Sequence, residues 1–465
     1  MLTRAEIIGS LMGQRKLFGT DGIRGKANVY PMTGEVAFGL GRAVTEYFKS
    51  VHTKRKKPLI IVGKDTRLSC YMLEQAFSAG VCSQGGEVIL TGPLPTPGIA
   101  FVTKSMRADV GVMISASHNP YYDNGIKIFD ANGLKLPDEV ELKLEDMIIN
   151  PAQIPTMTNG DLGNAKRLRE VFGRYLVHCK SALDERFDME GMRVVLDCAN
   201  GAGYKVTPMM YQELGAEVFC LGVDPNGVNI NDECGSLHPS KAQAKVINVR
   251  ADLGLCLDGD ADRCLIIDEL GKVVPGDVLI GCFAKLLLDE GVLKKGDTVV
   301  GTIMTNLGLE NYLKELGLKL HRTKVGDRYI IEYMEKNSSV LGGEPSGHVI
   351  FREKATTGDG ALAGLKMVEC MRFYKKTVSQ LTEDVVLYPH VLENVRVAEK
   401  PPLSKNKVIQ KALEEAEKEL GTKGRVVLRY SGTESKCRVM VEGENRSLVE
   451  SSCQKLVDVV KQELG

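Results

Sequence analysis

The chain has 465 residues, 43% of them hydrophobic, which is enough for about three globular domains of the usual ~150 residues. Its 60 basic and 60 acidic side chains cancel in net charge, so we expect neither a nucleic acid nor a membrane as a partner. Twelve cysteines without a C-x-x-C pair indicate neither a zinc ribbon nor a disulfide scaffold and fit a reducing cytoplasm, and no apolar run approaches the ~20 residues of a membrane span.

The first predicted elements are a glycine turn, a helix and a βα unit. The amino-terminal residues lack a sustained apolar core, so we expect no secretory signal. Three glycines around Arg24, within residues 17–25, predict a tight loop that brings a cation close to another group, although an ordinary glycine turn is the simpler interpretation. Apolar spacing then predicts a helix over 33–49, a strand over 58–62 and a helix over 71–80.

A reactive loop is predicted within residues 110–136. A short apolar strand breaks into the polar loop 115–120, and the chain returns through a second apolar stretch that carries Lys127. Because α/β folds place reactive groups on loops at the ends of buried strands, the hydroxyls of this loop are candidates. Asn119 precedes a proline, which keeps it out of the helical region and holds the loop open. The competing interpretation is a β-hairpin with a serine-rich turn.

The strand, glycine turn and helix of the first unit recur twice. A looser stretch with prolines at 150–163 predicts a domain boundary, and the pattern then returns at 193–203 and at 298–308. The copies share little identity, but their wide spacing predicts a recurring α/β domain.

A metal site is predicted where Asp258, Asp260 and Asp262 alternate between two apolar strands. Buried carboxylates must be paired or coordinate a metal, because three of them repel one another strongly. Side chains on one face of a straight strand are ~6.6 Å apart, whereas Mg²⁺ with oxygens at about 2.0–2.1 Å needs neighbouring ligands ~3 Å apart, so the chain must curl here. A calcium EF-hand fails because Arg263 replaces the required glycine and the flanks read as strands. A solvated acidic turn is the remaining alternative.

A sugar-binding loop is predicted at 342–348, which places Glu344, Ser346 and His348 between glycines. Neutral sugar hydroxyls need such paired donors and acceptors. A lone histidine more often has a structural role, but here a carboxylate and a hydroxyl flank it. The preceding stretch 324–329 reads by itself as a surface turn.

The carboxy-terminal part reads as a smaller domain that begins after residues 382–388. Helices are predicted over 407–420 and 448–464, and a loop between them suits an anion because it combines backbone N–H groups, hydroxyls and guanidinium forks. A hairpin with exposed arginines is the alternative. The candidate anion-binding residues are Arg429, Ser431, Gly432, Thr433 and Arg438.

Several separated motifs resemble those of the α-D-phosphohexomutases, and together they cover nearly the whole chain. They are FGTDGIRG at 18–25, SASHNP at 115–120, DGDADR at 258–263, TKVGDRY at 323–329, GEPSGH at 343–348 and RYSGTES at 429–435. The form of the serine loop looks most like the bacterial phosphoglucosamine mutases. Two features depart from the family pattern: Pro345 stands where that branch usually has glutamine, and Tyr430 and Ser435 stand where the family has prolines.

The resemblance implies a role for each motif. The second serine of the loop carries the phosphoryl group in that family, which corresponds to Ser117, and Arg24, Lys127 and His348 are then further catalytic candidates. The implied Mg²⁺ ligands are Ser117, Asp258, Asp260 and Asp262. The implied substrate contacts are Arg263, Glu344, Ser346, Arg429, Ser431, Gly432, Thr433 and Arg438.

The resemblance also implies an α/β fold of three similar, layered, mixed-sheet domains and a smaller α+β carboxy-terminal domain around a central cleft. The expected domains are 1–162 with the serine loop, 163–266 with the metal loop, 267–382 with the sugar loop and 383–465 with the phosphate-binding loop.

The activity that the resemblance implies is a reversible isomerisation of glucosamine 6-phosphate to glucosamine 1-phosphate. It would proceed through a phosphoserine enzyme and a 1,6-bisphosphate, with glucose or glucosamine 1,6-bisphosphate as intermediate or activator, and would supply amino sugars for peptidoglycan. The alternative within the family is a phosphomannomutase/phosphoglucomutase. The expected partner is a hexosamine phosphate, and the expected assembly is a monomer or a homodimer.

Three other classes of protein are alternatives. A serine hydrolase lacks support because Ser117 is not in a G-x-S-x-G elbow. A phosphatase could use Asp258 as its nucleophile, and a sugar-phosphate-binding protein would bind without turnover.

Overall fold

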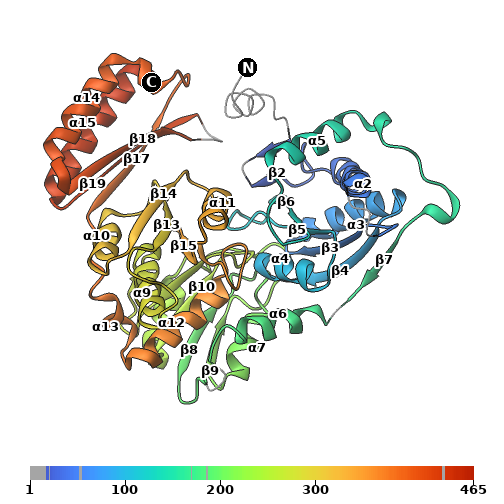
Figure 1. Ribbon diagram of the computed structural model, residues 1–465, viewed down its shortest axis with the longest axis horizontal. Coiled ribbons are helices and arrows are strands. Elements are labelled where there is room, and N and C mark those ends of the chain that lie inside the picture. Colours follow the sequence, from blue (N-terminus) through green and yellow to red (C-terminus); the bar gives the residue numbers. More distant parts are fainter. Residues whose placement is uncertain (1–16, 20, 52–54, 169, 185–186, 432–434) are drawn as a thin grey trace.

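The computed structural model describes residues 17–19, 21–51, 55–168, 170–184, 187–431 and 435–465. These residues form four sheets, and each sheet is the centre of one unit of the chain (Figure 1). Three units are layered α/β structures, and the fourth is a smaller α+β unit, so the predicted fold class is confirmed. None of the helices in this part of the chain combines the length and the apolar character that a bilayer crossing requires.

The first unit has a seven-stranded mixed sheet in the order β1-β2-β6-β5-β3-β4-β7. Its strands are β1 (Phe18–Gly19), β2 (Gly22–Lys26), β3 (Leu59–Lys64), β4 (Glu87–Pro93), β5 (Val110–Ile114), β6 (Asp123–Asp130) and β7 (Asn164–Arg167). Its helices are α2 (Gly34–Val51), α3 (Leu68–Ser83), α4 (Thr96–Ser105) and α5 (Asp138–Ile149).

The two faces of this sheet belong to different cores because strand side chains alternate. Ile60 and Val62 of β3 pack in a core with α2, α3 and α5. Ile61 faces the other side, where α4 begins the largest core of the protein. That core runs on without a break into the second and third units, through Leu196 and Leu279. The first three units are therefore packed against one another through apolar side chains.

The second unit has the sheet order β12-β11-β10-β8-β9, and the third has β14-β13-β15-β16. The strands of the second unit are β8 (Arg193–Asp197), β9 (Glu217–Leu221), β10 (Leu253–Leu257), β11 (Cys264–Ile267) and β12 (Val273–Val274), with helices α6 (Val171–Lys180), α7 (Val206–Glu213) and α8 (Ser240–Val249). Those of the third are β13 (Thr298–Thr302), β14 (Lys319–Thr323), β15 (Leu341–Gly343) and β16 (Val349–Phe351), with helices α9 (Gly276–Asp289), α10 (Leu307–Glu315), α11 (Asp327–Asn337), α12 (Gly360–Tyr374) and α13 (Val378–Thr382).

The three sheets share one topology. In each, a central strand (β3, β8 or β13) has a parallel neighbour on both sides, and the third strand continues into an antiparallel fourth. The recurring α/β domain predicted from the glycine turns is therefore present. The turn between the third and fourth strands also has the same position in every copy, namely after β5, after β10 and after β15.

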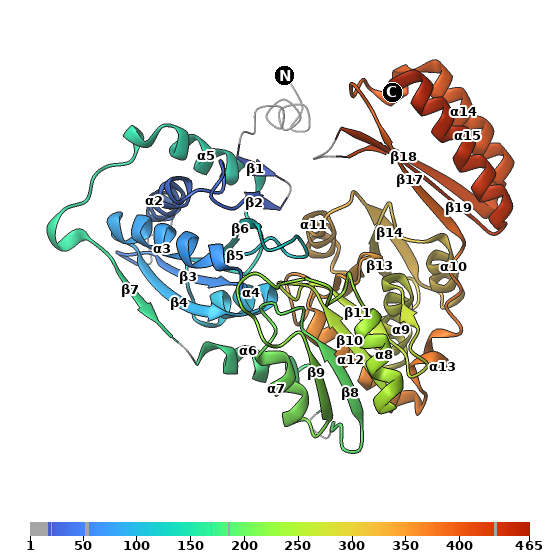
Figure 2. The ribbon, with the colours of Figure 1, turned by 180° about the vertical axis from the view of Figure 1, so that it is seen from behind.

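The fourth unit has a three-stranded antiparallel sheet in the order β17-β19-β18, covered by two helices. Its elements are β17 (His390–Arg396), α14 (Lys407–Leu420), β18 (Gly424–Tyr430), β19 (Lys436–Gly443) and α15 (Arg446–Leu464). Its apolar residues form a separate core. Figure 2 shows this unit beside the third one, with the tips of its strands directed toward the side on which β2 and α11 lie.

Polar contacts connect the fourth unit to the third. Arg425 Nη1 donates to Ile303 O at 3.0 Å, and Glu442 Oε1 accepts from Leu307 N at 2.9 Å. Short 3₁₀ helices lie in the connections of the chain: η1 (Pro151–Gln153), η2 (Asn159–Asp161), η3 (Leu403–Lys405) and η4 (Gly421–Lys423).

Two sheets extend past the expected boundaries. After the loose stretch 150–163 the chain returns as β7 and pairs with β4, so the first sheet continues beyond residue 162. In the second unit β11 ends at residue 267 and β12 follows at 273–274, so that sheet continues beyond residue 266. Edge strands as short as β7 and β12 carry almost no periodic signal, so the sequence predicts domain boundaries that lie before them.

Candidate active site

A cavity of about 460 Å³ lies between the first three units. The first unit contributes residues around β2 and before α5, the second contributes the metal loop, and the third contributes the start of α11 and the sugar loop. The charged side chains of its lining are Asp21, Arg24, Lys135, Asp138, Asp262, Arg263, Asp327, Arg328, Glu344 and His348.

Three of the loops predicted to be functional occupy the equivalent turn of the three repeated sheets. The serine loop (residues 115–120) follows β5, the metal loop (258–263) follows β10, and the sugar loop (344–348) follows β15. Because the three units pack with these turns toward one another, loops that are far apart in the sequence meet. Ser117 O lies so close to Gly259 that a Cβ atom there would be 2.5 Å from it, so glycine is required at this contact.

Ser117 lies where the serine loop contacts the metal loop. Its hydroxyl donates a hydrogen bond to Asp258 Oδ2 at 2.6 Å, and only 1% of the residue is exposed. His118 Nδ1 is 3.4 Å from the same hydroxyl. The hydroxyl of Ser117 is therefore directed at the first aspartate of the metal loop.

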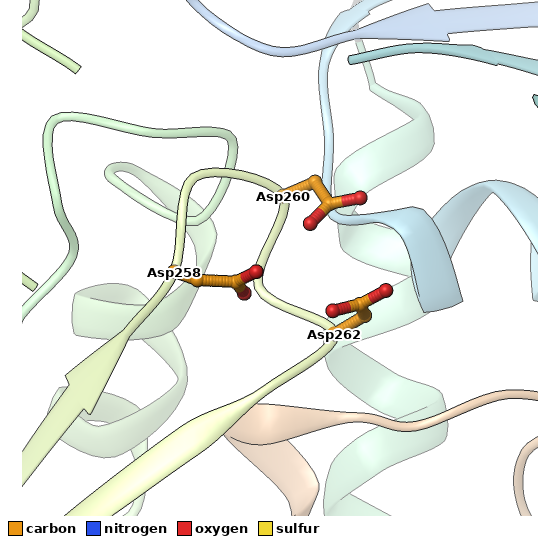
Figure 3. Close-up of side chains that lie close together, drawn as sticks. All are labelled: Asp258, Asp260 and Asp262. Atoms are coloured by element: carbon orange, nitrogen blue, oxygen red, sulfur yellow. The ribbon is translucent and has the colours of Figure 1, made fainter. Parts of the chain in front are cut away.

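The three aspartates of the metal loop converge, as Figure 3 shows for Asp258, Asp260 and Asp262. One carboxylate oxygen from each lies within 4.8 Å of the others, and all three residues are buried. The loop curls because Ala261 adopts a left-handed conformation, with φ of +57°. The strands β10 and β11 flank it, which excludes the helical flanks of an EF-hand.

The donor set fits a hard divalent cation. Within the described part of the chain, Asp260 Oδ1 and Asp262 Oδ1 are buried without a hydrogen-bond partner. Burial raises the pKa of Asp258 well above its usual value, and the neighbouring charges of Asp262 and Asp260 add to this. Carboxylate oxygens that are crowded, buried and under-bonded are what Mg²⁺ binds in proteins.

Lys127 compensates much of this negative charge. It lies on β6, and its Nζ is 2.9 Å from Asp260 Oδ2, 3.4 Å from Asp262 Oδ2 and 3.3 Å from Asp21 Oδ2. Burial by itself would lower the pKa of Lys127, but the three carboxylates outweigh that effect and hold it well above the usual value. Lys127 is therefore a buried ammonium ion inside the aspartate cluster.

Arg24 lines the cavity and forms an ion pair with Asp21, which lines it too. Asp21 also pairs with Lys135, whose Nζ contacts Asp327 Oδ1 at 2.8 Å. This chain of charges joins the first unit to the start of α11 in the third. Burial would raise the pKa of Asp21, but Lys127, Lys135 and Arg24 hold it well below the usual value.

Three residues of this chain of charges were not predicted from the sequence, namely Asp21, Lys135 and Asp327. Two of these had a signal, since Asp21 lies in the glycine stretch with Arg24 and Asp327 lies in the stretch 324–329. Lys135 had none, because its partners are 114 and 192 residues away in the sequence.

His348 brings the sugar loop close to two carboxylates, that of Asp262 in the metal loop and that of Asp327 at the start of α11. Its Nε2 accepts a hydrogen bond from Gly358 N at 2.9 Å, while Nδ1 is 3.8 Å from Asp262 Oδ1 and Nε2 is 3.7 Å from Asp327 Oδ2. Burial would lower the pKa of His348, but the carboxylates of Asp262, Asp327 and Glu344 together outweigh it and the net shift is upward. In the same loop Glu344 Oε1 accepts from Gly326 N at 3.2 Å. Ser346 is exposed.

Arg263, the last residue of the metal loop, contacts His118 of the serine loop. Its Nη1 is 3.1 Å from His118 Nδ1. Burial, and then the nearby Arg263, lower the pKa of His118 to about 4. His118 is thus neutral at physiological pH and accepts the hydrogen bond from the guanidinium.

Three of the predicted phosphate-binding residues, Arg429, Ser431 and Arg438, are not part of the cavity lining. Arg429 on β18 is directly opposite Arg438 on β19, and Ser431 is buried at the end of β18. Burial and the charge of the adjacent Arg438 lower the pKa of Arg429. The two like charges repel each other, and an anion bound between them would relieve this repulsion. Gly432 and Thr433 fall outside the described residues. The cavity lining includes no described residue of the fourth unit.

The chain matches four related domain families over most of its length. They are described as phosphoglucomutase/phosphomannomutase alpha/beta/alpha domains I, II and III and the C-terminal domain, and they match residues 15–154, 173–271, 275–388 and 392–459. All four occur in the order of the units described above.

Two relatives cover nearly the full chain. A protein of Nitratidesulfovibrio vulgaris named phosphoglucosamine mutase is 49% identical over 454 residues, which is 97% of this chain and 100% of that protein. A phosphoglucosamine mutase of Pelobacter propionicus is 50% identical over 452 residues, or 97% of this chain and 99% of that protein.

Solved structures share the fold at lower identity. A phosphoglucomutase/phosphomannomutase family protein from Burkholderia thailandensis superposes with a TM-score of 0.80 at 21% identity, covering 97% of this chain and 98% of that one. The N-acetylphosphoglucosamine mutase of Aspergillus fumigatus, solved with GlcNAc-6P and magnesium, superposes with a TM-score of 0.65 at 19% identity, covering 97% and 96%. From the four domain matches and the full-length relatives, this chain belongs to the phosphoglucomutase/phosphomannomutase family of phosphohexomutases.

Proposed function

We propose that this protein is a phosphoglucosamine mutase, which interconverts glucosamine 6-phosphate and glucosamine 1-phosphate. Its relatives of that name support the choice of substrate. One geometric observation supports the chemistry, namely that Ser117 Oγ donates a hydrogen bond to Asp258 inside the aspartate cluster. A hydroxyl at this place can accept a phosphoryl group and give it up again, as covalent catalysis requires.

The proposed reaction begins with a phosphoryl group on Ser117 Oγ. The C1 hydroxyl of glucosamine 6-phosphate attacks the phosphorus, the bond from phosphorus to Ser117 Oγ breaks, the sugar hydroxyl loses its proton to a base and Oγ regains a proton. The resulting 1,6-bisphosphate turns over in the cavity. Ser117 Oγ then attacks the phosphorus of the C6 phosphate and loses its proton, the bond from that phosphorus to the C6 oxygen breaks, and the C6 oxygen gains a proton. This releases glucosamine 1-phosphate and restores the phosphoserine. Such transfers depend mainly on positioning and charge stabilisation.

Asp258, Asp260 and Asp262 would hold one Mg²⁺ together with Ser117. When bound there, the cation would neutralise charge on the transferring phosphoryl oxygens. Lys127 already places a second positive charge among the same carboxylates, and Arg24 and Arg263 line the cavity on either side. These three side chains would stabilise the phosphoryl group from the protein's side.

We assign the proton transfers to Lys127 and His348. Both are buried, and both approach the aspartate cluster, one from β6 and the other from the turn before β16. Glu344, in the cavity lining, and Ser346, on the same loop, would bind the sugar hydroxyls.

The fourth unit would bind the phosphate that does not react. Arg429, Ser431, Gly432, Thr433 and Arg438 supply the donors for it, and the like charges of the two arginines favour an anion between them. Because this unit has a core of its own and contributes no described residue to the cavity lining, we propose that it moves toward the cavity when substrate binds.

A turnover assay tests the proposal. Purified protein with Mg²⁺ and a trace of glucose 1,6-bisphosphate is offered the phosphates of glucosamine, glucose and mannose, and intact mass shows phosphate on Ser117. We expect the highest kcat/KM with glucosamine phosphates, and a loss on the order of 10³-fold or more in Ser117→Ala. The exposed Ser105→Ala is the matched control.

Three outcomes would contradict the proposal. Preference for mannose or glucose phosphates would make the protein a phosphomannomutase/phosphoglucomutase. Phosphate trapped on Asp258 instead of Ser117 would make the aspartate the nucleophile. Binding of glucosamine phosphate without conversion would leave a sugar-phosphate-binding protein.

A further inference from the structure

The backbone at Ser117 is held in a conformation that few residues with side chains adopt. Its φ is +52°, in the left-handed region, which is unfavourable for a residue with a Cβ. The surrounding structure must therefore stabilise it. Part of this comes from Ser115, whose Oγ accepts from Ser117 N at 3.0 Å and donates to Asp65 Oδ2 at 2.7 Å.

Arg67 binds the carbonyl side of the same loop. Its guanidinium donates to Ser117 O at 2.9 Å, to Asn119 O at 2.8 Å and to Pro120 O at 2.5 Å. Asp65 holds the guanidinium in turn, with Arg67 Nε donating to Asp65 Oδ2 at 2.8 Å. Both side chains of this pair are completely buried. The charge of Arg67 is thus paired, and three of its four remaining N–H donors are used on three backbone oxygens of one loop.

Asn231 binds two of these oxygens from the second unit. Its Nδ2 donates to Ser117 O at 3.0 Å and to Asn119 O at 3.0 Å. Its own backbone N donates to Ala199 O at 2.9 Å, which fixes the residue to the loop after β8. An amide NH₂ group has two hydrogens, so both are used on the serine loop.

We propose that Arg67 and Asn231 are positioning residues for phosphoryl transfer, since together they hold the peptide of Ser117 so that its Oγ faces Asp258. This inference deepens the proposed mutase function and rests on it. Ser117 O accepts from both residues, so a rotation of this peptide breaks both bonds. Oγ would then leave its place 2.6 Å from Asp258.

The arrangement also makes the alignment depend on two units. Arg67 belongs to the first unit with the serine loop, whereas Asn231 belongs to the second with the metal loop. Asn231 Nδ2 is in addition so close to Gly259 that a Cβ atom there would be 2.9 Å from it. The same amide thus touches both loops, and it sets the position of the nucleophile relative to the aspartates.

The experiment compares Asn231→Ala, Asn231→Asp and Arg67→Lys with the native protein. Each protein is phosphorylated with glucose 1,6-bisphosphate, and the fraction carrying phosphate on Ser117 is measured by intact mass. A single-turnover assay with glucosamine 6-phosphate, expressed per phosphorylated molecule, gives the maximal transfer rate and the half-saturating concentration. The ³¹P chemical shift of the phosphoserine reports its surroundings. Asn229→Ala is the control in the same loop, because among the described residues its side chain bonds only residues of its own loop, at 224 and 226.

We expect the maximal transfer rate to fall about 10-fold in Asn231→Ala and about 100-fold in Arg67→Lys, the scale set by small misplacements of a reacting group. Asn231→Asp should be slower than Asn231→Ala, because its carboxylate faces two carbonyl oxygens. Half-saturation should stay within about twofold, since the sugar and phosphate contacts are elsewhere. The phosphoserine signal should shift in all three variants and remain native in Asn229→Ala.

Two results would overturn the proposal. One is a native transfer rate and native ³¹P shift in the Asn231 variants, which would leave Asn231 and Arg67 as structural contacts between units. The other is a loss confined to half-saturation. If Arg67→Lys does not fold, the two Asn231 variants decide the question. Failure of the native protein itself to transfer phosphate would refute the mutase function instead, so the two failures are distinguishable.

Discussion

Replacing Asp277 by asparagine should make the stability of the third unit less dependent on pH. Asp277 lies at the start of α9 and is 3% exposed. Its Oδ2 accepts a hydrogen bond from Asn306 N at 2.8 Å, and its Oδ1 is buried without a hydrogen-bond partner among the described residues. Burial raises the pKa of this carboxyl from 3.8 to about 7, with Glu442 adding to the shift.

The sign of the effect follows from the direction of this shift. The native state keeps the proton up to a pH near 7, whereas the unfolded state loses it near 3.8. Between these values the unfolded state is favoured increasingly as pH rises, so the native protein loses stability from about pH 4 to pH 7. Below this pH window the ionisation of Asp277 does not change the free energy of unfolding, and above it the loss of stability is constant.

The magnitude follows from the same two values. A difference of about 3 pKa units corresponds to about 4 kcal/mol at pH 8 and about 1.5 kcal/mol at pH 5. Asparagine removes this penalty and keeps the acceptor for Asn306 N, but its NH₂ group replaces the unpaired Oδ1 at a cost of about 1–3 kcal/mol. That cost does not depend on pH. The gain of Asp277→Asn should therefore be about 2.5 kcal/mol larger at pH 8 than at pH 5.

Hydrogen exchange of peptides from α9 and from residues 303–308 is the suitable measurement, because a chain of several domains does not unfold in one step. Rates at each pH are corrected for intrinsic exchange. The control is Asp289→Asn on the same helix, where the hydrogen bond from Tyr374 lowers the pKa of the carboxyl. Its removal should cost stability at pH 8 and have no effect at low pH. A pH-independent gain in Asp277→Asn, or equal behaviour of the two variants, would refute the reasoning.

Three further predictions concern the site. Chelation of divalent cations should lower turnover by about 100-fold or more with recovery on adding Mg²⁺, and full activity after chelation would remove the metal from the proposal. Lys127→Met removes the ammonium group that Asp260 and Asp262 share, so in a chelator the hydrogen-exchange protection of peptides from β6 should fall by the equivalent of about 3 kcal/mol and Mg²⁺ should restore part of it; unchanged protection would contradict the buried ion pair. Arg429→Ala should raise KM about 10-fold while kcat changes less, as for a group that binds substrate and transition state alike, whereas Arg446→Ala on the exposed side of α15 should change neither.

Much of the fold could be predicted because its signals are local. The strand, glycine turn and helix at Leu59, Val194 and Val299 lie within about two dozen residues each, and the repeated domain follows from them. The aspartates of the metal loop could be recognised for the same reason, since alternating carboxylates between apolar strands need a cation wherever the chain places them. The edge strands β7 and β12 were not predicted because they are short and because every residue of β7 is exposed.

What only the tertiary structure decided is which groups meet. The sequence by itself determined a hydroxyl loop, an acidic loop and a glycine-bounded sugar loop, but not that these are the same turn in three copies of one sheet. It held no sign that Lys127 lies among the aspartates, that Lys135 joins Asp21 to Asp327, or that Asn231 reaches Ser117. Such contacts span more than 100 residues and leave no periodic or spacing pattern along the chain, because they arise from the packing of whole domains.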